Sequence, residues 1–121
     1  MTQITNLKQY DLEERTLFFA EKVRGFIKAV PRTLSNFEDL RQLARSSGSQ
    51  GANYIEANES LSKKDFLLRV KIAKKETKET RYWLKLVDIQ DSKELEKKRN
   101  DLINESNELM KIFGSIIEKS R

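Results

Sequence analysis

The chain has 121 residues, enough for one domain with one hydrophobic core and too few for two. With one proline, four glycines and no cysteine, it lacks the turn residues of an all-β fold, a disulfide framework and a thiolate metal site. The net charge of +5 favours an anionic partner without identifying it.

Charged residues make up 36% of the chain and hydrophobic residues 37%, a balance typical of long amphipathic helices with one buried stripe each. No apolar run approaches the roughly 20 residues of a membrane span, and the first residues do not follow a signal-peptide pattern. Together with the absence of cysteine, this leads us to expect a cytoplasmic protein that does not associate with membranes.

A first helix is predicted from about residue 11 to residue 30. Asp11 is expected to cap its start, and Pro31 to end it by removing a backbone donor and restricting the residue before it. Spacings of three and four direct one face toward a neighbour. That face comprises Leu12, Thr16, Phe19, Val23, Phe26 and Val30.

A second helix is predicted over residues 35–58, with Ser35 and Glu38 forming a capping box. Small residues fill positions 46–52, and a loop is the obvious interpretation because each glycine costs about 1 kcal/mol in a helix. The spacing of the stripe nevertheless continues unbroken, so we predict helix here and a tight crossing at Ser47, Gly48 and Gly51. The stripe comprises Phe37, Leu40, Ala44, Ser47, Gly51 and Tyr54.

Two more helices are predicted over residues 62–88 and 92–119. Ser62 is expected to cap the first, and either Asp91 or Ser92 the second. Short connections force consecutive helices to lie antiparallel, so residues 1–121 are predicted to form one all-α, up-down-up-down four-helix bundle. The first stripe comprises Phe66, Val70, Ala73, Thr77, Thr80, Leu84 and Val87. The second comprises Leu95, Leu102, Ser106, Leu109, Phe113 and Ile116, broadened by Ile103, Met110 and Ile117, and Arg99 weakens it.

The segment 62–81 carries eight basic and three acidic side chains, an excess equal to the net charge of the whole chain. At roughly 100° per residue, the basic side chains of this helix occupy an arc of roughly 60° to 180° from the core stripe, and Tyr82 shares that arc. Such an arc either binds phosphates or is a solvated face that maintains solubility. Its members are Lys63, Lys64, Lys71, Lys74, Lys75, Lys78, Arg81 and Lys85. Tyr82 would add a surface on which an unpaired base can stack.

A second apolar stripe on the same helix comprises Leu68, Ile72, Trp83 and Leu86. A bundle helix needs only one apolar face, so this stripe indicates either an oligomer interface anchored by Trp83 or a wide contact with the first two helices.

The chain contains no histidine and no cysteine, which removes Ser-His and Cys-His nucleophile pairs. The nearest fragment of a carboxylate metal site is Glu76 with Glu79, which the wheel places off the core face. No phosphate-binding glycine motif follows a strand. We therefore expect neither catalytic residues, nor a metal, nor a cofactor.

The stretch from Gln42 to Ser49, the stretch from Gly51 to Ala57, and the Ser-Lys-Lys-Asp-Phe sequence at 62–66 resemble the signature of four-helix-bundle proteins encoded within ribosomal RNA intervening sequences. The resemblance continues over 71–76 and 79–84. Many members have Ile-Ala-Glu-Gly after the asparagine, where this chain has Tyr54-Ile55-Glu56-Ala57 and then Asn58, so this helix end is expected to differ.

The resemblance implies an antiparallel bundle, often assembled as a homopentamer. It also implies a relationship to the accessory protein of diversity-generating retroelements, a basic pentameric barrel that binds nucleic acid and a reverse transcriptase. Arg45, Asn53 and Glu56 match signature positions, for which the family implies no catalytic role. The resulting hypothesis is a non-enzymatic, oligomeric protein that binds RNA or DNA; the alternative is an oligomeric scaffold that docks a protein partner such as a reverse transcriptase.

Overall fold

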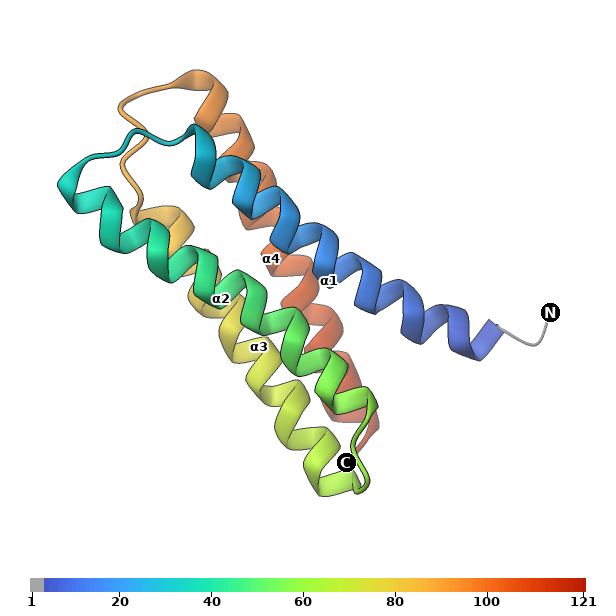
Figure 1. Ribbon diagram of the computed structural model, residues 1–121. Helices are drawn as coiled ribbons and strands as arrows, with labels where there is room; N and C mark the ends of the chain where they lie inside the picture. The colour runs from blue at the N-terminus through green and yellow to red at the C-terminus, as the bar shows by residue number, and fades with distance from the viewer. Residues whose placement is uncertain (1–3) are drawn as a thin grey trace.

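The computed structural model describes the backbone of residues 4–121 and the side chains of residues 12–121. Its elements are α1 (Ile4–Ala29), α2 (Leu34–Asn58), α3 (Lys63–Leu86) and α4 (Lys93–Lys119), with no strand in this range. Each helix packs against the next, α1 also contacts α4, and consecutive helices run in opposite directions (Figure 1). The prediction of an all-α, four-helix chain is confirmed.

Helix α1 begins at Ile4, seven residues before the predicted start, so Asp11 lies inside the helix and does not cap it. No proline or glycine interrupts residues 4–10, and nothing in the local sequence ends the helix there. The side chain of Asp11 lies outside the described side chains. All six residues of the predicted α1 stripe are buried, and Pro31 follows the end of the helix as expected.

The start of α2 differs from the prediction because Thr33, and not Ser35, is the N-cap: its side chain accepts a hydrogen bond from the amide of Asn36 at 3.2 Å. Asn36 is fully buried, and its Nδ2 donates to the carbonyls of Pro31 and Asp88 at 3.0 and 2.8 Å. Its Oδ1 accepts from the Asp88 amide at 2.9 Å. Asn36 therefore joins the α1–α2 and α3–α4 connections.

The first turn of α2 departs from the predicted stripe because Asn36, and not Phe37, faces the interior, whereas Leu40, Ser47, Gly51 and Tyr54 are buried as predicted. Phe37, placed in the buried stripe by its spacing, is 65% exposed, and Ala44 is only partly buried. Leu40 and Leu43 carry the apolar contact of this half of the helix.

Helix α2 continues through the small-residue stretch to Asn58, which confirms the helical prediction there. A Cβ placed on Gly51 would lie 3.0 Å from Thr16 Oγ1 and 3.2 Å from Thr16 Cβ, so α1 and α2 approach closely at this point. Beside it, Gln50 Nε2 donates to the Thr16 carbonyl at 2.9 Å. Gly48 does not share the close approach, because its nearest neighbour would be Arg24 Nη2 at 3.7 Å.

The caps of α3 and α4 follow the sequence signals. Ser62 accepts a hydrogen bond from the Asp65 amide, and Ser92 accepts one from the Leu95 amide, which settles the choice between Asp91 and Ser92. Arg99, in the weak position of the α4 stripe, donates to the Val87 carbonyl at 2.9 Å. Ile116 of that stripe is partly buried, and Ile117, which was predicted to broaden the stripe, is buried. None of the helices in the described range is long and apolar enough to cross a membrane.

Candidate nucleic-acid interface

The predicted basic residues lie along one uninterrupted helix, α3. Seven of the eight are exposed lysines, and the eighth, Arg81, is partly buried and donates to Asn107 Oδ1 at 2.7 Å. Arg81 therefore links α3 to α4 and is less available to a ligand than the lysines. The exposed members are Lys63, Lys64, Lys71, Lys74, Lys75, Lys78 and Lys85.

The structure brings four of these lysines to one groove between α3 and α4, with a volume of about 370 Å³. On its α4 side the groove is lined by the apolar residues Met110 and Ile117 and by Gly114. Glu118 and Arg121, near the end of α4, also line it. A Cβ on Gly114 would lie 3.4 Å from Lys74 Nζ, so the missing side chain leaves room for this ammonium group over α4. The lysines of the groove are Lys71, Lys74, Lys75 and Lys78.

None of the seven lysines forms an ion pair or a side-chain hydrogen bond with another side chain described in residues 12–121. The ion pairs there use other cations, including Arg15, Arg45 and Lys97. Like charges one turn apart on a helix repel each other by roughly 0.2–0.5 kcal/mol per pair. Lys71 with Lys75, and Lys74 with Lys78, are such pairs, so a bound anion would relieve an existing repulsion.

The second apolar stripe of α3 separates into two parts. Leu68 and Leu86 are 54% and 50% exposed, whereas Ile72 and Trp83 are partly buried. Trp83 packs against the core, and its Nε1 donates to Glu79 Oε1 at 3.4 Å. Trp83 therefore contributes to the bundle, and the two leucines are the part of the stripe left open to another molecule.

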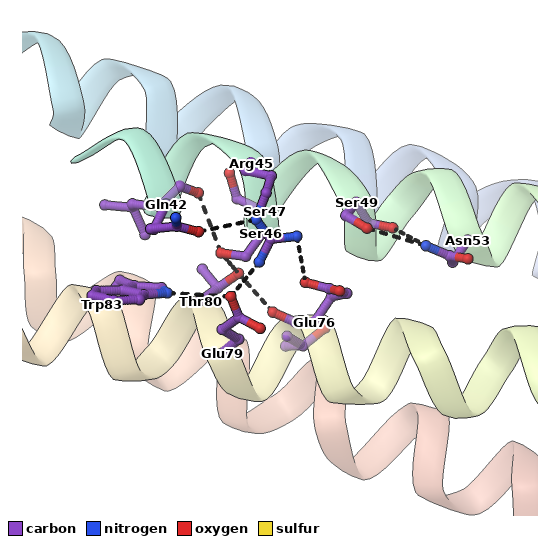
Figure 2. Close-up of polar contacts among 12 residues, drawn as sticks. Gln42, Arg45, Ser46, Ser47, Ser49, Asn53, Glu76, Glu79, Thr80 and Trp83 are labelled. Carbon is purple, nitrogen blue, oxygen red and sulfur yellow. Dashed lines mark hydrogen bonds and ion pairs between the residues drawn. The ribbon is translucent and has the colours of Figure 1, made fainter. Parts of the chain in front are cut away.

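A polar seam joins α2 to α3 beside this stripe (Figure 2). Arg45 pairs with Glu79 and, at 3.2 Å, with Glu76. Glu76 is only 8% exposed, although the helical wheel placed it off the core face. That prediction was wrong because α3 packs extensively against α2, which buries a wider arc of α3 than the apolar stripe alone marks.

The electrostatics of Arg45 follow from this position. Burial alone would lower the pKa of its guanidinium, but the negative charges of Glu76 and Glu79 outweigh burial and raise the pKa above its ordinary value. The arginine therefore stays charged and holds both carboxylates in the seam.

The rest of the seam consists of hydrogen bonds in which at least one of the two partners is uncharged. Thr80 Oγ1 donates to Ser46 Oγ at 2.9 Å, and Arg69 Nη1 donates to Asn53 Oδ1 at 3.0 Å. Two of the three signature positions, Arg45 and Asn53, thus join α2 to α3, while Glu56 is exposed. Among the described side chains, no cluster of three or more carboxylates is arranged to hold a metal ion.

Comparisons with known proteins agree with this architecture. The profile of the 23S rRNA-intervening sequence protein family matches residues 8–115. A crystal structure from Bacteroides thetaiotaomicron, described as a protein with unknown function from the S23 ribosomal protein family, is similar with a TM-score of 0.75 and 33% identity. The match covers 87% of this chain and 96% of that one. A search of curated proteins found no match.

Proposed function

The chain belongs to the 23S rRNA-intervening sequence protein family, and from that premise we propose that it is a non-enzymatic, oligomeric protein that binds the phosphate backbone of nucleic acid. The observation that carries the proposal is the convergence of Lys71, Lys74, Lys75 and Lys78 on one open groove, without a carboxylate paired to any of them. A merely solvated charged face has no need for such convergence, because mixed charges keep a surface soluble.

The length of the lysine row suits a polyanion better than a single small anion. Lys71 and Lys78 are seven residues apart, about 10 Å along the helix axis at 1.5 Å per residue. Along the axis of B-DNA each strand advances about 3.4 Å per phosphate. A lysine row aligned with that axis is therefore as long as about three phosphate steps. Lys63, Lys64 and Lys85 extend the same face at both ends of α3.

Binding of this kind releases counterions, so the affinity falls steeply as the salt concentration rises. Each neutralised phosphate contributes about −0.9 to the slope of log K against log salt concentration. We expect a labelled duplex to bind at low salt, with a slope that falls by about three when the four groove lysines are changed to glutamine. The measurement is fluorescence anisotropy over a salt series.

The matched control changes Lys28, Lys93, Lys97 and Lys98 to glutamine, which removes the same charge from outside the groove. If the control loses as much affinity as the groove variant, only the net charge matters and the site is wrong. Absence of wild-type binding to both a duplex and a single strand at low salt would reject the proposed function itself.

Self-association is the second part of the proposal, and it rests on the exposed Leu68 and Leu86. The two leucines lie on the same side of α3 because 18 residues make five helical turns, so one subunit packed along that side would cover both. By family resemblance we expect a pentamer. Light scattering should give an oligomeric mass for the wild type and a smaller mass for Leu68→Ser with Leu86→Ser. An oligomer that binds no nucleic acid would favour the alternative function, a scaffold that docks a protein partner.

A further inference from the structure

Tyr82 extends the lysine row with an aromatic ring. It follows Lys78 by four residues and Lys75 by seven, which places the three side chains on one face of α3, one and two turns apart. The ring is 58% exposed. A cationic row with an exposed ring in line is the combination that single-stranded nucleic acid requires, because phosphates need charge and unpaired bases need a flat surface.

The Tyr82 ring is supported from behind. It contacts Trp83 edge to face, with ring centroids 5.0 Å apart and planes at 81°. Trp83 in turn packs against the core and donates to Glu79, which Arg45 of α2 holds in an ion pair (Figure 2). An edge-to-face contact covers at most one face of the Tyr82 ring, so the other face remains available.

We propose that this site takes single-stranded nucleic acid, with one base stacked on Tyr82 and the adjacent phosphates on Lys71, Lys74, Lys75 and Lys78. The inference rests on the proposed function and adds the class of strand. In a duplex each base is already covered by its neighbours and paired, so Tyr82 has no base face to contact. Trp83, Glu79 and Arg45 are positioning residues that fix the ring without touching the ligand.

The test uses three labelled probes of about 12 nucleotides, within the usual range of single-strand sites: an oligouridine, a strand of the same length without bases, and a duplex. Tyr82→Ala should weaken binding of the oligouridine by roughly 5- to 100-fold, as expected for the loss of one stacked base. The other two probes should be unaffected, and Tyr82→Phe should keep wild-type affinity. Phe37→Ala removes an exposed aromatic from α2 and should change nothing.

Trp83 is the single tryptophan and supplies a second measurement. Oligouridine should change its emission through the contact with Tyr82, the strand without bases should not, and Tyr82→Ala should abolish the change even at low salt, where the lysines still bind. Far-UV circular dichroism checks that each variant is folded.

The outcomes separate the two proposals. Equal losses for all three probes in Tyr82→Ala, or no loss for any, would overturn the stacking site while leaving phosphate binding intact. Failure of the wild type to bind any probe would overturn both.

Discussion

The close approach of α1 and α2 at Gly51 makes a quantitative prediction. In a helix interior, replacing glycine by alanine gains about 1 kcal/mol of stability from the backbone alone. At Gly51 the added Cβ would lie 3.0 and 3.2 Å from two atoms of Thr16, whose own hydroxyl is bonded to the Glu13 carbonyl. Overpacking of this kind costs about 1–3 kcal/mol, so Gly51→Ala should range from neutral to about 2 kcal/mol less stable.

Gly25 provides the matched control, because a Cβ there would meet nothing within 4 Å. Gly25→Ala should therefore stabilise the protein by up to about 1 kcal/mol, a difference from Gly51→Ala of about 1–3 kcal/mol. Urea denaturation followed by the helical circular dichroism signal, at one protein concentration, measures both. Equal stabilisation by the two substitutions would show that α1 and α2 do not approach as closely as described.

Three further perturbations test other parts of the structure. Asn36→Asp keeps the shape of the side chain but removes the two hydrogen bonds that the buried Nδ2 donates and places an oxygen opposite two carbonyls. At about 1–3 kcal/mol for each lost bond, it should cost about 2–6 kcal/mol in urea denaturation. Arg45→Met should cost about 1–3 kcal/mol, less than for a fully buried pair because Arg45 is 47% exposed, and adding Glu76→Gln should restore part of the loss. Burial raises the pKa of the Tyr54 hydroxyl above its ordinary value of 10.0, so the unfolded chain loses this proton at a lower pH than the folded protein. The free energy of unfolding should therefore fall as the pH rises above 10, and it should fall less steeply with pH in Tyr54→Phe, as alkaline denaturation would measure.

A fourth perturbation concerns the acidic end of the groove. Glu118 opposes an incoming phosphate, so Glu118→Gln should raise affinity for the labelled strand by about twofold at low salt. A matched substitution outside the groove, Glu94→Gln, should have a smaller effect, and equal gains would mean that Glu118 acts only through the net charge.

The elements themselves could be predicted from the sequence because their causes are local. Spacings of three and four marked the buried stripe of α1, and Ser62 and Ser92 marked the helix starts through their position before an acid or an apolar run. The helix through Ser46–Ala52 could also be predicted, because periodicity over a whole helix outweighs the cost of two glycines. The family signature was legible in the same stretch.

Tertiary structure decided which side chains are buried at helix contacts and which helices face one another, because both depend on how the helices are rotated and packed. Asn36 donates hydrogen bonds to the carbonyls of Pro31 and of Asp88, which lies 52 residues further along the chain. These bonds hold Asn36 inside the bundle, and Phe37 beside it is exposed. Packing of α2 on α3 buried Glu76 beside Arg45, which a wheel drawn for one helix cannot show. The groove between α3 and α4, where Gly114 of one helix faces Lys74 of the other, is likewise formed only by the packing of the two helices. Periodicity reports which side of a helix is apolar, whereas the partner on that side is fixed only when all four helices pack together.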